Sequence, residues 1–492
     1  MSAEKRYLCL DFGASSGRAI LGKYNGGILT LEEIHRFSND PVEVCGTLYW
    51  DVLALFHEIK QALLKSKAYG AVESIGVDTW GVDFGLLDKD GFLLENPVHY
   101  RDARTVGTLE QAFQKLPREE FYQITGNQFM EINTAFQLLA LKTKRPQVLE
   151  NAETLLLMPD LFNYLLTGER RAEYSIASTT QLLDAKRRVW SGRVLSALEI
   201  PARLFPDVIP TATPVGQLRT ALCEELGLTA TRVTAVAGHD TQCAMASVPA
   251  ETEDFLFLSC GTWSLLGTEL AAPLITNEAY RCNVTNEGGY GGKASFLKNI
   301  IGLWLVQETR RQWQREGKAL SFAEMESLAE SAKPFQSFID PDDARFAPTG
   351  NIPKRIREYC AETGQTVPES KAEVLRCIYD SLAMKYRYAI GQIERCTQKR
   401  YDTLHIVGGG VKDRLLCALT ADICQKTVCA GPVEATAYGN LLLQMLADGT
   451  VKDLPAARAL VRRCEQPQLF TPHPPEDTDA AYQQFLKGTG LC

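Results

Sequence analysis

Residues 7–18 read YLCLDFGASSGR, and residues 255–264 repeat their plan near mid-chain as FLFLSCGTWS. Each copy is an apolar run that ends in a polar residue and leads into a glycine turn with hydroxyl side chains. A second apolar run follows, so each copy predicts strand, tight turn and strand. One such turn alone is typical of an ordinary hairpin. The repetition favours duplicated halves whose turns face one nucleotide, because their backbone N–H groups and hydroxyls suit phosphate oxygens.

The composition is that of a globular protein with a large core. The chain has 492 residues, of which 45% are hydrophobic and 23% charged, enough for two substantial domains. Its formal net charge of −8 and the absence of a Lys/Arg cluster argue against a nucleic-acid partner. No apolar run approaches the ~18 residues of a membrane span. We therefore expect a cytoplasmic protein whose partners are small molecules.

The 14 cysteines and six histidines show no metal-ligand spacing, so no structural metal is predicted. Cys360 and Cys377 flank a polar loop and are candidates to approach each other. A reducing compartment favours free thiols at both positions.

Strands and helices alternate in both halves of the chain. Strands are predicted at residues 74–78, 233–237 and 403–407, and helices at 51–67, 118–144, 159–166, 297–314, 371–393 and 435–446. The helix at 51–67 has Asp51 as its expected N-cap. The loop at 340–353 is expected to be mobile. A polar connector at 249–254 predicts domains 1–248 and 249–492.

The two glycine turns differ chemically, because Asp11 ends the first strand where the second copy has Ser259. A carboxylate beside a phosphate site repels the ligand unless a divalent cation lies between them. Mg²⁺ prefers one or two carboxylates together with phosphates and waters. Asp11 is therefore a magnesium candidate, direct or through water, and the alternative is that it caps its own turn.

Asp240 follows the strand at 233–237 and precedes a helix, which is where ligands bind in open α/β sheets. It is the best candidate for a general base, since phosphoryl transfer asks mainly for alignment and a carboxylate that takes the hydroxyl proton. A simple N-cap role for Asp240 is the alternative.

Three other glycine-rich or acidic stretches have a composition that ligand sites share. Residues 408–410 (GGG) follow a strand and leave room for an adenosine. Residues 78–83 (DTWGVD) combine carboxylates, an indole and a glycine, which suits a small polyol, although a structural turn is equally compatible. Residues 287–294 (EGGYGGKA) fail the phosphate-loop pattern, and residues 281–287 are too polar for the buried strand of a dinucleotide site.

Taken together with residues 298–304, YRDART at 100–105, LTG at 166–168 and GPVEA at 431–435, these motifs closely resemble the FGGY carbohydrate kinases. The resemblance covers nearly the whole chain. It implies a duplicated actin-like, ribonuclease-H-like α/β ATPase fold, with two domains around a cleft. It also implies transfer of the γ-phosphoryl group of ATP, with Mg²⁺, to the 1-hydroxyl of L-rhamnulose in rhamnose catabolism.

The resemblance also implies roles for particular residues. Asp240 looks like the catalytic base, in an N-terminal domain that binds the sugar, while the C-terminal domain binds the nucleotide. The expected ATP contacts are Ala14, Ser15, Ser16, Gly17, Arg18, Thr262, Gln307 and Gly409. The expected sugar contacts are Gly81, His239, Asp240, Thr241 and Asn299. Family members often carry polar amides after the triple glycine, whereas Val411, Lys412 and Asp413 follow it here.

Two other functions share part of this pattern. An actin-like ATPase without a sugar substrate needs the phosphate turns but no polyol site, and sugar-stimulated ADP release distinguishes it from a kinase. The second alternative is a kinase for a related deoxyketose such as L-fuculose. That sugar differs from L-rhamnulose by one epimeric hydroxyl, and a sequence indicates such a difference only weakly.

Overall fold

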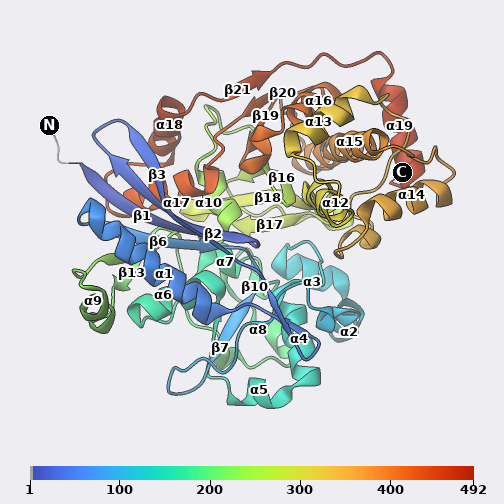
Figure 1. Ribbon diagram of the computed structural model, residues 1–492. Helices are drawn as coiled ribbons and strands as arrows, with labels where there is room; N and C mark the ends of the chain where they lie inside the picture. The colour runs from blue at the N-terminus through green and yellow to red at the C-terminus, as the bar shows by residue number, and fades with distance from the viewer. Residues whose placement is uncertain (1–3, 492) are drawn as a thin grey trace. The chain divides into compact units, whose positions relative to one another are not determined.

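The computed structural model describes residues 4–491, which form two compact units (Figure 1). Unit 1 contains the residues up to 251, together with 269–296 and 435–465. Unit 2 contains 252–268, 297–434 and the residues from 466 onwards. Two segments from the C-terminal half therefore belong to the unit that carries the N-terminal half. The linear boundary near residue 249 stays a prediction.

The first sheet has the strand order β13-β14-β6-β1-β2-β3. Strands β1 (Lys5–Phe12), β2 (Ser16–Tyr24) and β3 (Leu29–Ser38) are antiparallel neighbours, whereas β1, β6 (Ser74–Thr79) and β14 (Arg232–Ala235) are parallel. Strand β13 (Thr213–Gln217) closes the edge in antiparallel register. The predicted first hairpin and the predicted strands at 74–78 and 233–237 are confirmed.

Helix α1 (Val52–Ser66) packs its apolar face into the core of unit 1. Its N-cap is Asp51, as predicted, whose Oδ1 accepts a hydrogen bond from the Ala54 N–H at 3.1 Å. Leu55, Ile59 and Leu63 are buried. Each such side chain contributes about 1.5–3 kcal/mol when fully buried, so this face fixes the helix on the sheet.

The second sheet repeats the plan of the first, with the order β17-β18-β16-β15-β19-β20-β21. Its hairpin is β15 (Leu256–Cys260) and β16 (Trp263–Leu270). Strands β15, β19 (Thr403–Val407) and β20 (Thr427–Ala430) are parallel, and β21 (Gln468–Phe470) is an antiparallel edge. Strands β17 (Thr285–Gly288) and β18 (Ala294–Ile301) complete it. The predicted duplication is thus present in the topology.

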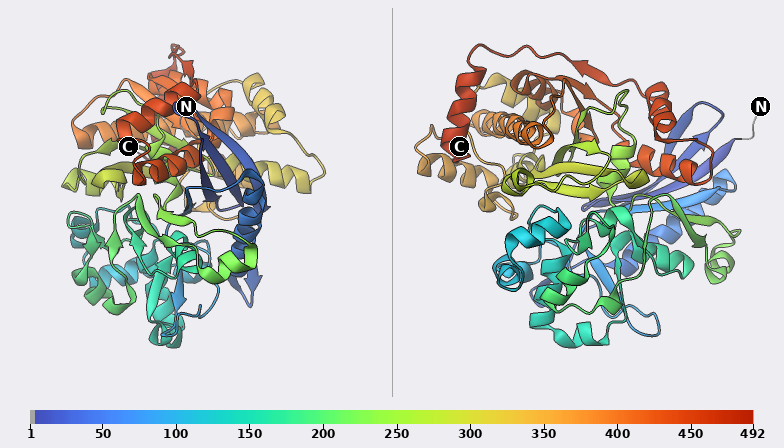
Figure 2. Two further views of the ribbon diagram at one scale, coloured as in Figure 1. Left: turned by 90° about the vertical axis from the view of Figure 1, so that its left-hand side faces the viewer. Right: turned by 180° about the vertical axis from the view of Figure 1, so that it is seen from behind.

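Helices α17 (Ala435–Ala447) and α18 (Leu454–Cys464), drawn in red, lie beside the blue strands of unit 1 (Figures 1 and 2). Helix α17 also packs closely on α10 (Asp240–Ala246). A Cβ atom on Gly439 would lie 1.7 Å from the backbone oxygen of Cys243, so only glycine allows this approach. The C-terminal segment thereby reaches the helix that starts at Asp240.

Several predicted helices have different limits in the structure. The stretch at 118–144 is two helices, α3 (Arg118–Thr125) and α4 (Thr134–Lys144), because Gly126 ends α3 in the left-handed conformation at φ 63°. The helix predicted at 297–314 begins later, as α12 (Trp304–Arg315), since the apolar run before it belongs to β18. Helices α6 (Met158–Thr167), α15 (Lys371–Thr397) and α17 lie where helices were expected, and α16 (Arg414–Cys424) follows the triple glycine.

Further helices and strands connect these elements. They are β4 (Val42–Val44), β5 (Thr47–Tyr49), β7 (Phe84–Leu87), β8 (Thr154–Leu157), β9 (Ala172–Glu173), β10 (Leu183–Asp184), β11 (Val189–Trp190), β12 (Val208–Ile209), α2 (Thr108–Lys115), α5 (Pro146–Asn151), α7 (Tyr174–Ala177), α8 (Gly192–Leu198), α9 (Thr220–Leu226), α11 (Asn277–Cys282), α13 (Phe322–Ser331), α14 (Ile352–Glu362) and α19 (Thr478–Thr489). No helix in the described part of the chain has the length and hydropathy of a membrane span.

Two predictions about unit 2 concern its loops. Cys360 and Cys377 are both buried, free cysteines whose thiols lie within hydrogen-bonding reach of each other. In the loop at 340–353, Asp340 and Asp342 form ion pairs of 2.7 and 3.0 Å with the buried Lys385 of α15. The mobility of that loop stays a prediction.

Candidate functional site

The carboxylates of Asp11, Asp78 and Asp240 lie at the carboxyl ends of the parallel strands of the first sheet. Asp11 ends β1, Asp78 ends β6, and the two residues are partners in the parallel register. Asp240 is the first residue of α10, shortly after β14, which pairs with β6. The chain just beyond β14 continues this alignment, because Thr79 and His239 form a parallel bridge. The carboxyl ends of parallel strands are the usual ligand edge of such sheets.

Asp11 lies beside the first glycine turn. Its Oδ2 accepts a hydrogen bond of 2.6 Å from Nη2 of Arg18, its partner across the hairpin. The turn is closed by the Gly13 N–H, which donates to the Ser16 oxygen at 2.9 Å, and Ser15 is exposed. The structure therefore brings the predicted phosphate turn and the predicted metal residue together.

Asp78 is fully buried between β1 and α17. Its Oδ2 accepts a hydrogen bond of 2.6 Å from Nδ2 of Asn440, whose Oδ1 is in turn held by Gln444 at 2.7 Å. Among the residues that the structure describes, no donor reaches its Oδ1, and the side chain lies within reach of the Asp11 carboxylate. Burial first, and then the charge of Asp11, raise the pKa of Asp78 well above its usual value.

Asp240 is the carboxylate of the three that remains open to solvent. Its side chain is 31% exposed, against 9% for Asp11. The N-cap of α10 is His239, so the N-cap alternative for Asp240 is wrong. Instead, its Oδ1 accepts from Thr241, from the N–H at 2.6 Å and from Oγ1 at 3.2 Å. Burial raises the pKa of Asp240, and the neighbouring His239 charge opposes that rise.

Two buried glutamates that were not predicted as site residues, Glu173 and Glu287, hold the loop that contains Gly238 and His239. Glu173 Oε2 accepts from the Gly238 N–H at 2.9 Å, and Ser175 Oγ, itself bonded to Glu173, accepts from the His239 N–H at 3.3 Å. Glu287 Oε2 lies 3.0 Å from His239 Nδ1. Glu287 lies on β17, which is buried although its side chains are polar, because Glu287 and Asn286 are hydrogen-bonded to Gln242 and Gly126.

The segment at 78–83 does not present two free carboxylates, contrary to expectation. Asp83 is buried and its oxygens are occupied by Trp50 Nε1 at 2.6 Å, Trp80 Nε1 at 3.0 Å and Gln137 Nε2 at 2.8 Å. Burial raises the pKa of Asp83 to about 6, which these donors oppose. The Asp83 carboxylate therefore stabilises the segment through internal hydrogen bonds, and its oxygens are not available to accept hydrogen bonds from a ligand.

The same segment contains a strained turn next to Gly81. Val82, a β-branched residue, has φ 68°, and the Asp83 N–H donates to the Gly81 oxygen at 2.9 Å. Such a conformation is costly for a β-branched side chain and is commonly kept at ligand sites. Gly81 is half-buried, and a Cβ atom there would meet Thr179 at an ordinary 3.4 Å.

Unit 2 carries the remaining predicted site residues. Thr262, in the second glycine turn, donates from Oγ1 to Gln307 Oε1 at 3.3 Å. Gly410 lies directly against this turn, because a Cβ atom there would be 2.2 Å from Cys260 Sγ, whereas Gly409 is exposed. Asn299 lies half-buried on β18.

The departure after the triple glycine has a structural reason at one position. Asp413 is the N-cap of α16, since its Oδ1 accepts from the Leu416 N–H at 3.0 Å, and its Oδ2 accepts from the Tyr379 hydroxyl at 2.6 Å. Val411 and Lys412 belong to the short helix that links the glycines to this cap.

The carboxylates of Asp11 and Asp78 fit a divalent cation whose other coordination positions are filled by phosphates and water. Within residues 4–491, no group of three or more His, Cys, Asp or Glu side chains is arranged to hold a metal. However, Mg²⁺ commonly takes only one or two carboxylates and fills its other positions with phosphates and water. Asp78 Oδ1 accepts from no donor within residues 4–491 and Asp11 is adjacent, so a cation would relieve the repulsion between the two carboxylates.

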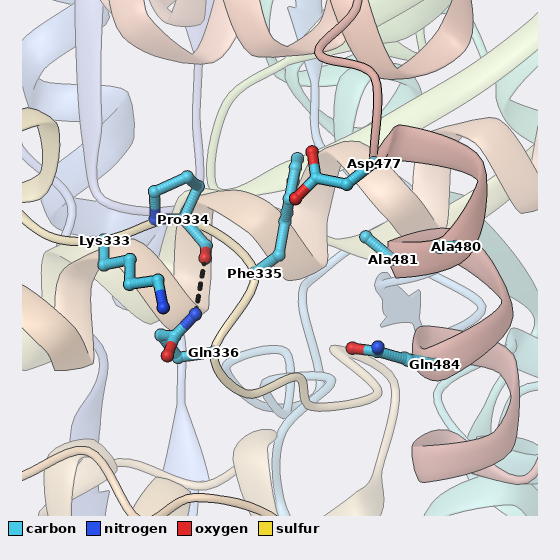
Figure 3. Close-up of a pocket in the computed structure, with 8 residues that line it drawn as sticks. All are labelled: Lys333, Pro334, Phe335, Gln336, Asp477, Ala480, Ala481 and Gln484. Atoms are coloured by element: carbon cyan, nitrogen blue, oxygen red, sulfur yellow. Dashed lines mark hydrogen bonds between the residues drawn. The ribbon is translucent and has the colours of Figure 1, made fainter.

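A separate hollow lies in unit 2, lined by Lys333, Pro334, Phe335, Gln336, Asp477, Ala480, Ala481 and Gln484 (Figure 3). Its volume is about 400 Å³. The Gln336 side chain folds back onto the Pro334 oxygen at 2.9 Å. None of the predicted site residues lines it, so size alone does not identify the site.

Comparison with known proteins gives the family. The N-terminal domain model of the FGGY family of carbohydrate kinases matches residues 6–247, and its C-terminal domain model matches residues 256–447. The chain belongs to the FGGY family of carbohydrate kinases. Members of this family act on a sugar and ATP, and as ATP-dependent kinases they generally require a divalent metal.

Relatives match along almost the whole length of the chain. A rhamnulokinase from Bacteroides thetaiotaomicron is 42% identical over 483 residues, which cover 98% of this chain and 99% of the relative. A rhamnulokinase from Enterococcus faecalis is 42% identical over 494 residues, covering 99% of each. The kinase prediction is thus confirmed over an ATPase without a sugar substrate.

Solved structures agree on the fold. Ligand-bound xylulose kinase from Lactobacillus acidophilus aligns with a TM-score of 0.79 at 16% identity, covering 99% of this chain and 96% of that one. Plasmodium falciparum glycerol kinase with ADP aligns with a TM-score of 0.78 at 14% identity, covering 98% and 96%. The predicted duplicated actin-like fold is confirmed.

Proposed function

We propose that the protein transfers the γ-phosphoryl group of ATP to the 1-hydroxyl of L-rhamnulose, giving L-rhamnulose 1-phosphate and ADP. The Asp240 carboxylate carries the proposal, because it is partly exposed at the ligand edge of the sheet and lies near Asp11 and Asp78. Full-length similarity to proteins named rhamnulokinase supports the choice of sugar.

In this proposal Asp240 accepts the proton of the attacking hydroxyl. Phosphoryl transfer passes through a loose transition state, so alignment and charge stabilisation supply most of the rate. The Thr241 hydrogen bonds fix the carboxylate at the mouth of α10. The sugar contacts are Gly81, His239, Asp240, Thr241 and Asn299, and the ATP contacts are Ala14, Ser15, Ser16, Gly17, Arg18, Thr262, Gln307 and Gly409.

Asp11 would hold Mg²⁺, directly or through water, with Asp78 beside it. When bound, the ion neutralises charge on the phosphates. Arg18, already paired with Asp11 at 2.6 Å, keeps that carboxylate oriented toward the turn and places a positive charge there. Asn440 holds Asp78 from the opposite side, so the pair stays in place despite its mutual repulsion.

The test is ADP release by the full chain with L-rhamnulose, L-fuculose, D-xylulose, glycerol and no sugar. We expect the highest kcat/KM with L-rhamnulose and little release without sugar. A preference for L-fuculose would replace the proposed substrate with its epimeric alternative, and equal rates with and without sugar would contradict kinase activity. The Asp240→Asn variant serves as the background for contaminating ATPases.

A further inference from the structure

His239 lies between two carboxylates, one on each side of its imidazole ring. Glu287 Oε2, on β17, is 3.0 Å from Nδ1, and Asp240 Oδ1 is 3.4 Å from Nε2. The Nδ1 contact is close but is not aligned as a hydrogen bond, so the attraction is that of an ion pair. The Glu287 side chain is 5% exposed and the His239 side chain 10%. The ring therefore links a buried charge to the more open carboxylate of the proposed base.

The position of Glu287 is set by the surrounding polar groups. Gln242, on α10, donates from Nε2 to Glu287 Oε2 at 3.1 Å. The orientation of that amide is fixed by Ser295 Oγ, which donates to Gln242 Oε1 at 2.7 Å. The Gly288 N–H donates to Ser178 Oγ at 2.7 Å and anchors the strand. A carboxylate buried this deeply needs such partners, and its ionic partner here is His239.

The charges that face His239 and Asp240 are mostly negative. The charges of Glu287, Asp240 and Glu173 act on His239, and the charge of Asp11 acts on Asp240, whose own charge acts on Asp78. Burial favours a neutral ring, but the charge of Glu287 and its contact outweigh burial, so the pKa of His239 is raised. Burial raises the pKa of Asp240, and the charge of His239 limits that rise, while the charge of Asp11 adds to it.

We propose that Glu287 is a positioning residue for phosphoryl transfer, which holds His239 as an imidazolium against Asp240 and thereby keeps the base ionised in a buried acidic site. The inference rests on the proposed function for the role of Asp240. The link between Glu287 and His239 does not depend on that function and is measured separately.

The first measurement is the titration of His239 in the full chain without ligands. With histidine-selective isotope labelling, six imidazole signals are expected, and His239→Asn identifies the one of interest. In Glu287→Gln we expect its midpoint to fall by about 1–3 pH units, the usual effect of an opposite charge at this distance. An unchanged midpoint overturns the proposal. Glu287→Asp, which keeps the charge, is expected to retain most of the shift.

The second measurement is the pH profile of kcat with sugar and ATP saturating. Loss of the imidazolium raises the pKa of Asp240, so the acid limb in Glu287→Gln is expected to move to higher pH and the rate to recover at alkaline pH. A merely structural role would lower the rate at every pH instead. A lowered His239 midpoint with an unmoved acid limb also overturns the proposal.

The matched control is Ser295→Ala, which removes one hydrogen bond from the same network without changing a charge. We expect neither the His239 midpoint nor the acid limb to move. If this variant shifted both as far as Glu287→Gln, packing rather than charge would be responsible and the proposal would be wrong. If Asp240→Asn kept its turnover, the proposed function would fail while the His239 titration would still report on Glu287.

Discussion

The first and second glycine turns have the same backbone plan and different chemistry. In the first sheet, Asp11 lies in parallel register with Asp78, whereas the corresponding Ser259 lies beside Val407. Across the hairpin, Asp11 is opposite Arg18, whereas Ser259 is opposite Leu265. One copy thus collects charged side chains at its strand ends, and the other keeps neutral ones.

In the proposed function, this difference gives the two copies different tasks. Acidic side chains at both turns would repel a polyphosphate, so a nucleotide is bound more favourably when only one copy is acidic. In the neutral copy the backbone of the triple glycine lies close to the turn, because Gly410 packs directly against Cys260. The turn residue Thr262 also contacts Gln307. Duplication therefore supplies two similar turns that differ in charge at three matched pairs of positions, namely Asp11 and Ser259, Asp78 and Val407, and Arg18 and Leu265.

The largest expected effect comes from the acidic copy. Asp240→Asn should lower kcat by about 10² to 10⁴-fold, the usual contribution of a positioned general base. The amide is nearly isosteric and its oxygen still accepts from Thr241, so the fold and nucleotide binding should persist. Steady-state kinetics, thermal unfolding and ADP titration check the three parts. A folded variant with most of its turnover would remove Asp240 from the role of base.

The next effect tests the asymmetry between Asp11 and Ser259. Asp11→Asn should raise the Mg²⁺ concentration for half-maximal rate by about ten- to a hundred-fold, typical of residues that orient a metal or its waters. Added Mg²⁺ should partly restore the rate. Ser259→Ala changes the equivalent strand end in the second copy and should leave the Mg²⁺ midpoint unchanged. Equal midpoints in the two variants would contradict the assignment of the cation to the first copy.

The sequence predicted more of the fold than of the site. Asp11 and Asp240 each follow a local apolar run, and Asp51 caps α1 as its position indicates. By contrast, Glu173 and Glu287 act through partners far along the chain, such as Gly238 and His239, and no local pattern marks them. Asp83 has the appearance of a ligand residue in sequence, but Trp50 and Gln137, distant in sequence, occupy its oxygens.

A moderate effect is expected at Gly81, beside the strained Val82. Gly81→Ala should raise the KM for sugar by roughly ten- to a hundred-fold, the cost of a lost hydrogen bond of about 1–3 kcal/mol, and spare the KM for ATP. The protein itself tolerates the methyl group, since its nearest neighbour is Thr179 at 3.4 Å. Gly192→Ala, with open space around its Cβ atom, is the control for glycine replacement. A raised KM for ATP instead would move this segment to the nucleotide side.

The smallest effect is expected in the neutral copy. Thr262→Val keeps the shape of the side chain and removes its hydroxyl, which contacts Gln307 at 3.3 Å. Because a neutral hydrogen bond contributes about 0.5–1.5 kcal/mol, the KM for ATP should rise about two- to tenfold while the KM for sugar and the Mg²⁺ midpoint stay constant.

Thr268→Val is the matched control for that substitution, because it removes a buried hydroxyl from the same hairpin. Thr268 Oγ1 donates to the Phe255 oxygen at 2.8 Å, away from the turn, so its loss should lower the unfolding temperature without changing the KM for ATP. If Thr262→Val raised the KM for sugar and spared ATP, the second turn would not be a nucleotide contact. The proposed division between the two copies would then be wrong, because the second turn would contact the sugar and the first turn would remain the phosphate contact.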